Sequence, residues 1–299
     1  MGTTLKNALI TEVVDGDTIR VRIDGEEHKI RIGSVDTEES NPGGSKPVTK
    51  LGIETAKMAK QFFTAHDGSF TTVDLEFDAD ESIEQCFIRH RDNYGRLICY
   101  VYRGGENYNL KLIREGWSPY FVKYGRSRLY HALFNDAEAD AQASERGVWN
   151  PAANAGGSSR DYTTLLPWWS WRAHIIEGFR EEGIEAGSLS VRLDYNKILD
   201  SAGARKQITV FCDLQHGIAK RPGNGVLINA GSRQQPFNLW IPEAQSEGSV
   251  SLIRLVEKRY AGYGRGFAYV SGRAEMYRDT PEIELTELSQ LSDFPIIAD

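Results

Sequence analysis

Apolar and polar side chains alternate in three successive runs between residues 8 and 36, and this alternation constrains the fold more than any other feature. A period of two is typical of half-buried strands, because successive side chains point to opposite faces of a sheet. Asp24-Gly25, between the second and third runs, is a hairpin signal. The apolar positions are Val13 and Val14, then Ile19, Val21 and Ile23, then Ile30, Ile32 and Val35. The sequence therefore predicts a β-rich first half.

Apolar residues at helical spacing follow at residues 49–66, at 107–117, where Gly116 closes the segment, and at 127–149. Two more strands are predicted at 70–77 and 87–102, the second with a turn at Asn93-Tyr94-Gly95. The order is therefore β-β-β-α-β-β-α-α. This order favours a small barrel padded by helices.

A segment rich in Ala, Gly and Ser, residues 150–161, is the expected linker to the second half of this 299-residue chain. A helix is predicted after Pro167, and the last hundred residues are rich in strand patterns. We expect a mainly β protein with helices, divided into a first domain at 1–150, a linker and docking helix at 151–182, and a β-rich domain at 183–299.

Composition narrows the function. The formal net charge is −7, from 35 basic and 42 acidic residues, so any phosphate recognition must come from local clusters. No run of about 18 apolar residues exists, so neither a membrane span nor a membrane partner is expected. The three cysteines are widely spaced and the six histidines lack ligand spacing, which argues against a disulfide framework and a zinc site. With no secretory signal visible, we expect a cytoplasmic protein, or a secreted one if a signal was trimmed.

Acidic and arginine side chains crowd the ends of the first and third predicted strands. If those strands are neighbours, Asp17 and Asp36 meet at one end of the sheet, where two like charges need a proton or a cation between them. Oxygen ligands without His or Cys suit Ca²⁺ or Mg²⁺. Arg31 has the parity opposite to its apolar neighbours and Arg96 follows a turn, so both guanidinium groups could face a phosphate beside the cation. Glu39 is a spare carboxylate that could take a proton from water.

Five separated segments resemble the thermonuclease family, the staphylococcal-nuclease-like domains. They are VVDGDTIRV, IRIGSVDTEES, LGIETAKMAKQFF, RDNYGRLICYVY and LIREGWSPYF, in the family's order and spacing across about residues 8 to 150. The resemblance implies a five-stranded OB-type barrel with three helices. It also implies hydrolysis of phosphodiesters in DNA and RNA with Ca²⁺, leaving 3′-phosphate ends.

The resemblance assigns roles to the acidic loop. Asp17 and Asp36 match the metal carboxylates, Thr37 the residue that lends its backbone carbonyl, and Glu39 the acid that orients or deprotonates the attacking water. The family usually has proline where this chain has Glu38. Loss of that proline frees φ and restores an N–H, so we expect a looser loop, with Glu38 as a competing ligand or base.

The resemblance also assigns the basic and aromatic residues. Arg31 and Arg96 match the pair that stabilises the transition state, and Tyr94 and Tyr124 fall where nucleotide-contacting tyrosines lie. Each residue alone has a structural interpretation as well, such as an exposed strand arginine or a turn residue. The presence of all these residues together favours a functional site.

Aromatic and arginine residues also interleave near the C-terminus, a pattern that suits stacking of single-stranded bases beside a phosphate-tracking groove. The candidates are Arg259, Tyr260, Tyr263, Arg265 and Arg273. The ending VSGRAEMYRDTPEIELTELSQL resembles the last hairpin of OB-fold nucleic-acid-binding domains, which implies a second, OB-like domain. Phe267 and Tyr269 fit equally well as core residues of a strand.

These observations predict a nuclease with Ca²⁺ or another divalent cation as cofactor and with DNA, RNA or both as partner, single strands in preference. The alternative is a non-catalytic module that binds nucleic acid or protein through a nuclease-like barrel. A third interpretation is an interaction scaffold that does not bind nucleic acid. The sequence leaves the oligomeric state open.

Overall fold

The computed structural model describes residues 1–43, 46–221 and 223–295. The chain divides into two compact units, Met1–Pro167 and Trp168–Asp299, and each is described by itself. The predicted domain at 183–299 is thus described up to residue 295, except for residue 222. In the described residues, no helix is long and apolar enough to cross a membrane.

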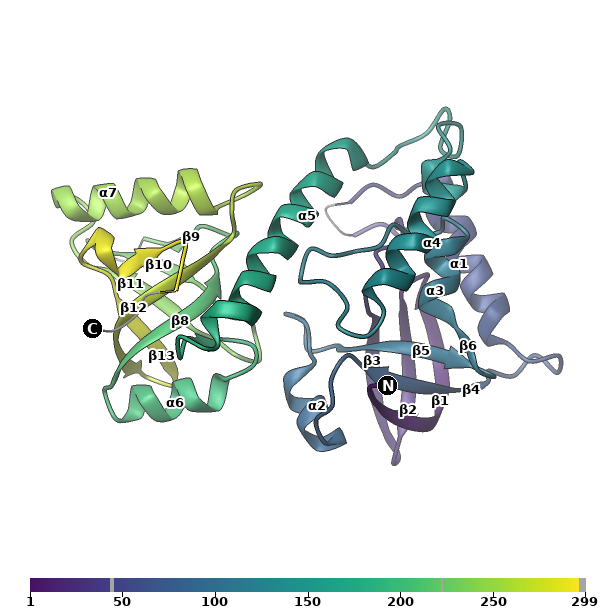
Figure 1. Cartoon of the computed structure of the whole chain (residues 1–299), viewed down its shortest axis with the longest axis horizontal. Coiled ribbons are helices and arrows are strands. Elements are labelled where there is room, and N and C mark those ends of the chain that lie inside the picture. Colours follow the sequence, from purple (N-terminus) through teal and green to yellow (C-terminus); the bar gives the residue numbers. More distant parts are fainter. Residues whose placement is uncertain (44–45, 222, 296–299) are drawn as a thin grey trace. The chain divides into compact units, whose positions relative to one another are not determined.

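The first unit is built on a closed barrel (Figure 1). Its strands are β1 (Thr3–Asp15), β2 (Thr18–Ile23), β3 (Glu26–Ile32), β4 (Thr72–Phe77), β5 (Leu97–Arg103) and the short β6 (Glu106–Asn107). The strand order is β3-β2-β1-β4-β5-β6, and a parallel pairing of β3 with β5 closes the first five strands into a barrel. The predicted five-stranded OB-type barrel is confirmed.

The alternation of the sequence explains this barrel. Ile19 and Ile30 face each other across β2 and β3 and are fully buried, whereas the adjacent cross-strand pair, Arg20 and Lys29, leaves the core. The β2–β3 turn has positive φ at Asp24 (51°) and Gly25 (87°), a conformation that suits an Asp-Gly hairpin.

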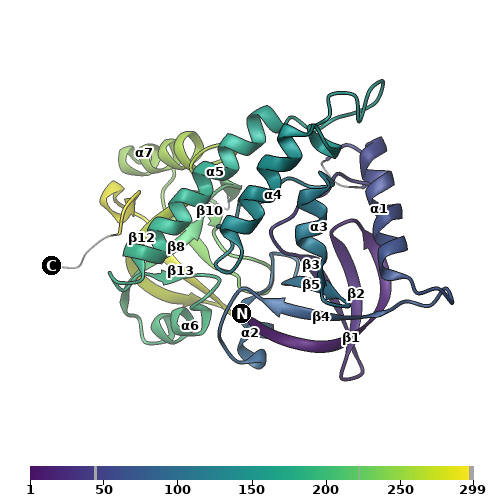
Figure 2. The same cartoon turned by 45° about the vertical axis from the view of Figure 1, so that its right-hand side comes forward.

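Helices cover the barrel of the first unit. They are α1 (Lys50–Phe63), α2 (Ile83–Arg89), α3 (Tyr108–Arg114) and α4 (His131–Ala143), followed by a 3₁₀ turn, η1 (Gly147–Trp149). Figure 2 shows α3 and α4 side by side, and α1 packs against β1. The order along the chain is as predicted except for α2 and the short strand β6.

Helix α2 replaces the start of a predicted strand. The sequence pattern predicts a strand over residues 87–102, but residues 83–89 are helical and the strand begins at Leu97. Ser82 and Gln85 form a reciprocal capping box, which gives two backbone N–H groups their acceptors at the start of the helix. The apolar run at Phe87 and Ile88 concealed this capping signal.

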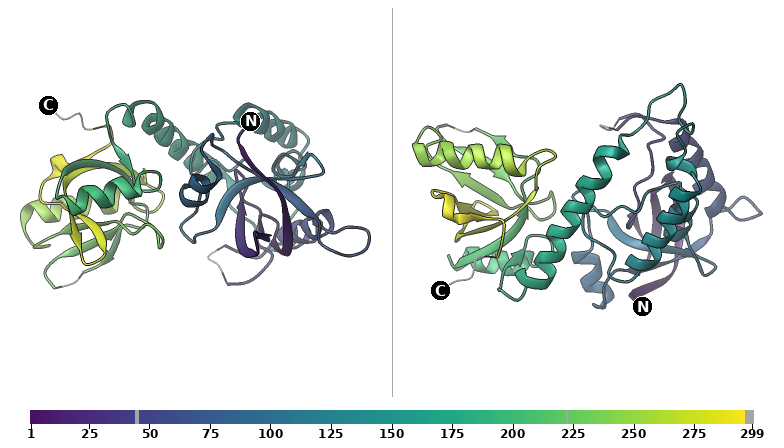
Figure 3. Two further views of the ribbon diagram at one scale, coloured as in Figure 1. Left: turned by 90° about the horizontal axis from the view of Figure 1, so that it is seen from below. Right: turned by 45° about the horizontal axis from the view of Figure 1, so that its top comes forward.

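The second unit is a β-rich sheet with helices, as expected. Its strands are β7 (Leu189–Ser190), β8 (Gln207–Asp213), β9 (Ile218–Lys220), β10 (Val226–Asn229), β11 (Asn238–Ile241), β12 (Phe267–Tyr277), β13 (Thr280–Glu284) and β14 (Leu291–Ser292). The order is β7-β8-β12-β13-β11-β10-β9, with β14 paired to β12. Its helical elements are α6 (Tyr195–Gly203), α7 (Glu247–Leu255), the π-helical turns η2 (Phe179–Gly183) and η3 (Val256–Tyr260), and a 3₁₀ turn, η4 (Leu288–Gln290). Figure 3 shows α6 and α7 on different sides of these strands.

Helix α5 (Tyr162–Gly178) begins before Pro167 rather than after it. Proline lacks an N–H, so the helix continues through Pro167 with one backbone hydrogen bond missing. In the second unit, Phe179, the first residue after α5, is buried, and the rings of Phe179, Phe211 and Phe267 stack in sequence with centroids 4.5 and 4.9 Å apart. This stack packs the residues after α5 onto β8 and β12.

Candidate active site

Asp17 lies in the tight turn between β1 and β2, and Asp36 lies just beyond the end of β3. Both residues are buried, with 8% of Asp17 and 3% of Asp36 exposed. Gly16 allows the turn to pack closely against α1, because a Cβ there would lie 2.6 Å from the side chain of Thr55 on that helix. Tyr108 of α3 donates its hydroxyl hydrogen to the Gly16 carbonyl (3.0 Å). The two acids therefore meet at one end of the barrel, although β1 and β3 are not neighbours as the prediction supposed, because β2 lies between them.

The loop from Asp36 to Glu39 is held by hydrogen bonds on both sides. The Thr37 N–H donates to Asp17 Oδ2 (2.9 Å), and the Asp36 N–H donates to Ser118 Oγ (2.8 Å). At the other end of the loop, the Thr49 N–H donates to the Glu39 carbonyl (3.2 Å), just where α1 begins. The backbone of the loop is thereby fixed to both the barrel and α1.

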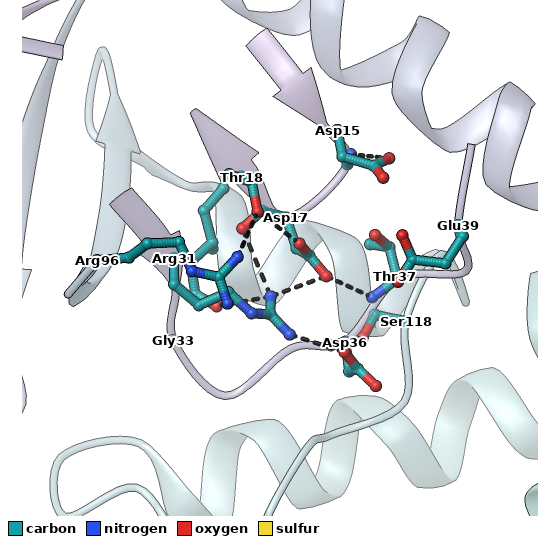
Figure 4. Close-up of polar contacts among 12 residues, drawn as sticks. Asp15, Asp17, Thr18, Arg31, Gly33, Asp36, Thr37, Glu39, Arg96 and Ser118 are labelled. Atoms are coloured by element: carbon teal, nitrogen blue, oxygen red, sulfur yellow. Dashed lines mark hydrogen bonds and ion pairs between the residues drawn. The ribbon is translucent and has the colours of Figure 1, made fainter. Parts of the chain in front are cut away.

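Arg31 joins the two carboxylates (Figure 4). Its Nη1 lies 2.8 Å from Asp17 Oδ2, and its Nη2 lies 2.7 Å from Asp36 Oδ1. The side chain leaves the core face of β3, as expected because Arg31 alternates with the core residues Ile30 and Ile32 along the strand. The Phe121 ring lies 5.9 Å from the guanidinium carbon.

Arg96 follows the turn at Asp92–Gly95 and is held by Asp92. Its Nη2 lies 2.6 Å from Asp92 Oδ2, and its Nη1 donates to Thr18 Oγ1 (3.3 Å). The Thr18 hydroxyl in turn donates to Asp17 Oδ1 (3.0 Å). Figure 4 shows the guanidinium groups of Arg31 and Arg96 beside each other, next to Asp17 and Thr18.

Glu39 is the most accessible acid of the loop, with 30% of its side chain exposed. Lys46 Nζ lies 3.3 Å from Glu39 Oε1 and 2.8 Å from Asp36 Oδ1, so it connects the two carboxylates. The predicted tyrosines lie nearby. Tyr94 is 77% exposed with its ring 5.5 Å from the Arg96 guanidinium, and Tyr124 packs against Phe121, which itself faces Arg31.

The charges shift the pKa values of the buried groups. Burial alone would raise the pKa of Asp36, but Lys46, Arg160 and Arg31 outweigh it and hold that pKa well below its usual range. Burial would lower the pKa of Arg31, but Asp17 and Asp36 more than compensate and raise it. Asp36 and Arg31 therefore both stay charged.

Asp15, two residues before Asp17, differs from Asp36 in the direction of its pKa shift. Burial raises the pKa of Asp15 above its ordinary value, and the neighbouring Asp17 charge adds to this, against a hydrogen bond from the Gly16 N–H. Asp15, the first carboxylate of the Asp-Gly-Asp turn, therefore holds a proton more readily than an ordinary aspartate.

The donor atoms suit a hard divalent cation. Asp17, Asp36 and the Thr37 carbonyl offer only oxygen, the ligand type of Ca²⁺ and Mg²⁺. Here the Arg31 guanidinium bridges the two carboxylates, so a cation would share Asp36 with positively charged side chains. One group of three ligand atoms within 4.8 Å of one another, Glu81, Cys86 and His90, occurs elsewhere in the described residues, where Glu81 already pairs with Arg89.

Comparison with known proteins agrees with this geometry. The staphylococcal nuclease homologue family matches residues 29–151. The thermonuclease of Staphylococcus intermedius is 30% identical over 141 residues, which cover 47% of this chain and 74% of the relative. The chain belongs to the thermonuclease family. The thermonuclease of Staphylococcus hyicus is 32% identical over 142 residues (47% and 74%), and endonuclease YncB of Bacillus subtilis is 29% identical over 146 residues (49% and 63%).

Glu38, at the position where the thermonuclease resemblance leads one to expect proline, corrects the prediction of a looser loop. It is 1% exposed, and its carboxylate accepts hydrogen bonds from Thr49 Oγ1 (2.5 Å), Asn154 Nδ2 (2.7 Å) and the Tyr162 hydroxyl (3.3 Å). These three donors hold the loop in place of a fixed φ. Glu38 therefore anchors the loop and its oxygens are not directed to a ligand.

Sequence reasoning missed several residues of this thermonuclease-like site, namely Lys46, Asp92 and Arg160. Arg160 comes from the segment assigned to a linker, yet its Nη2 lies 2.7 Å from Asp36 Oδ2. Asp92 lies within the quoted segment RDNYGRLICYVY, and its place four residues before Arg96 was the available signal. No local pattern marks Lys46 or Arg160, because their partners are distant in sequence or separated from them by a loop.

The C-terminal candidates lie in the second unit, and the structure brings three of them together. Arg259 and Arg265 both pair with Asp293, and the Tyr260 hydroxyl donates to the same carboxylate (2.8 Å). The other two are more exposed. Tyr263 is 64% exposed, although its ring contacts that of Trp168, and Arg273 pairs with Glu275 at 3.3 Å. Phe267 lies in the aromatic stack and is half-buried, whereas Tyr269 is buried beside the stack with its ring tilted by 49° to that of Phe211.

Proposed function

We propose that this protein is a nuclease that hydrolyses phosphodiester bonds in DNA, RNA or both. The names of its relatives, thermonuclease and endonuclease, support this proposal. The observation that carries it is the pair of guanidinium groups, Arg31 and Arg96, beside two buried aspartates and one accessible glutamate at one end of the barrel. Positive groups fixed in this way are suited to a phosphate whose negative charge rises during attack.

In the proposed reaction, Glu39 accepts a proton from water while the water oxygen forms a bond to phosphorus. The bond from phosphorus to the 5′ oxygen breaks, and this oxygen takes up a proton from solvent water, which leaves a 3′-phosphate and a 5′-hydroxyl. Arg31 exchanges carboxylate contacts for phosphate oxygens, and Arg96 approaches the same phosphate from its support on Asp92. A Ca²⁺ ion held by Asp17, Asp36 and the Thr37 carbonyl would add positive charge at the phosphate.

For the second unit we propose binding of the nucleic-acid strand, single strands in preference. The exposed ring of Tyr263 and the exposed Arg273 support this role, whereas Arg259 and Arg265 would have to exchange Asp293 for phosphate. A second binding unit on the same chain raises the effective concentration of substrate at the first.

The test uses 5′-labelled single-stranded DNA and RNA oligonucleotides, with Ca²⁺ or with a chelator. We expect fragments only with the cation, and 3′ ends that require a phosphatase before they can be extended. Asp17→Asn should abolish the response to Ca²⁺. Asp24→Asn, at the exposed β2–β3 hairpin, is the matched control and should cleave like the wild type.

Two outcomes would contradict the proposal. Salt-sensitive binding to the oligonucleotides without fragments, in Ca²⁺, Mg²⁺ or Mn²⁺, would favour a non-catalytic binding module. Absence of both binding and cleavage would favour an interaction scaffold.

A further inference from the structure

Residues 150–162 belong to the first unit and lie mostly beyond the matched family segment, which ends at residue 151. Their composition suggested a linker, yet side chains or carbonyls of this segment contact the start of α1 and the loop Asp36–Glu39. Lys50 Nζ donates to the Ala155 carbonyl (2.7 Å), and the Leu51 N–H donates to Asn154 Oδ1 (3.1 Å). The segment is thus attached to the helix that follows the acidic loop.

Arg160 makes the most buried of these contacts. Its Nη2 lies 2.7 Å from Asp36 Oδ2, and its Nη1 donates to the Asp36 carbonyl (3.2 Å). Both side chains are only 5% exposed. The planar guanidinium therefore fixes the side chain and the backbone of the same residue at once, which a single point charge cannot do.

Glu38 is bound by the same segment. Asn154 Nδ2 donates to one of its carboxylate oxygens (2.7 Å), and the Tyr162 hydroxyl donates to the other (3.3 Å). The Arg160 guanidinium lies 5.3 Å from the Tyr162 ring, so the two contacts on the loop also support each other. Residues 36 and 38, on either side of Thr37 and directly before Glu39, are both held from this side.

We propose that residues 154–162 complete the active site, with Arg160 as a positioning residue that fixes Asp36 and, with Asn154 and Tyr162, the loop that carries Thr37 and Glu39. This inference rests on the proposed nuclease function for its effect on rate. The burial of Arg160 against Asp36 favours positioning over direct contact with substrate. The segment is therefore part of the nuclease unit and not a spacer between units.

The experiment compares Arg160→Ala and Arg160→Lys in the full chain. Without nucleic acid, hydrogen exchange of the Thr37 amide reports the hold on the loop, because this N–H donates to Asp17. We expect exchange about tenfold faster in Arg160→Ala, with kcat lower by about tenfold and KM changed much less. Arg160→Lys keeps the charge but loses the two-point fork, so it should show an intermediate change in both measurements.

Arg146→Ala is the control, since Arg146 pairs with Asp140 at the end of α4 and does not contact the loop. Asn154→Ala removes a different contact of the same segment and should also speed exchange at Thr37. This second variant keeps the inference testable if Arg160→Ala fails to fold.

Wild-type exchange at Thr37 in both Arg160→Ala and Asn154→Ala would overturn the inference, whatever the activity. Full recovery of exchange and kcat in Arg160→Lys would also overturn it, since charge alone would then suffice. If exchange rises as expected but the wild type cleaves nothing, the positioning of the loop stands and the nuclease proposal fails.

Discussion

Both units set arginines against acids, but the surroundings of these pairs differ. In the first unit, Arg31 and Arg96 lie beside a loop whose Glu39 remains accessible, and several positive groups share Asp36. In the second unit, Arg172 is fully buried, pairs with Asp213 at 2.7 Å and lies 4.4 Å from the Phe267 ring. An arginine–carboxylate pair thus marks a candidate site only where an accessible acid and a second guanidinium stand beside it.

The largest expected effect separates the two kinds of pair by rate. Arg31→Ala and Arg96→Ala should each lower kcat/KM for a single-stranded oligonucleotide by about 10³-fold or more, because each removes a guanidinium from the charge that develops on phosphate. The measurement is single-turnover cleavage with Ca²⁺, together with circular dichroism to check the fold.

Arg22→Ala is the matched control, because Arg22 is an exposed arginine of β2. This variant should cleave at the wild-type rate. Cleavage at wild-type rates by both Arg31→Ala and Arg96→Ala would remove the functional distinction between the units.

The next effect concerns stability and falls on the second unit. Arg172→Ala leaves Asp213 without its partner and removes the cation from the Phe267 ring, so the free energy of unfolding of this unit should fall by about 3–5 kcal/mol. Urea unfolding followed by tryptophan fluorescence measures it, because four of the six tryptophans lie in this unit.

The exposed pair of Arg273 with Glu275 provides the contrast for this stability effect. Arg273→Ala should change the free energy of unfolding by about 0.5 kcal/mol or less, as is usual for surface substitutions. Equal losses in Arg172→Ala and Arg273→Ala would show that burial does not set the strength of these pairs.

The barrel and most of the site could be predicted from sequence because their signals are local. Alternation fixed which face of β3 carries Arg31, and the turn before Arg96 brought the second guanidinium to the same end of the barrel. The seven residues of α2 were missed, because the short apolar run at Phe87 and Ile88 fits a strand as well as a helix.

The missing parts of the site depend on contacts between distant residues. Glu38 accepts hydrogen bonds from Asn154 and Tyr162, which lie 116 and 124 positions further along the chain. Arg160 likewise lies 124 positions after Asp36, with which it pairs. Contacts between such distant residues leave no repeating pattern in a single sequence, so only composition was available to interpret residues 150–161. In the second unit, Asp293 lies beyond the quoted Arg/Tyr pattern, and its attachment to Arg259 and Arg265 could not be predicted.

The last expected effect is a pH response in the stability of the first unit. Burial raises the pKa of Glu138 on α4 to about 7, although the Tyr120 N–H donates to its Oε1 (2.7 Å) and opposes the shift. The folded protein therefore keeps a proton that the unfolded chain loses near pH 4.5, so stability should fall as the pH rises from about 4.5 to about 7 and then level off.

Glu138→Gln keeps an oxygen for the Tyr120 N–H and cannot ionise, so its melting temperature should exceed that of the wild type by more at pH 8 than at pH 5. His131, which contacts the Tyr120 hydroxyl, is the same residue in both proteins, so its contribution cancels in this difference. The same difference at both pH values would mean that Glu138 stays ionised in the folded unit.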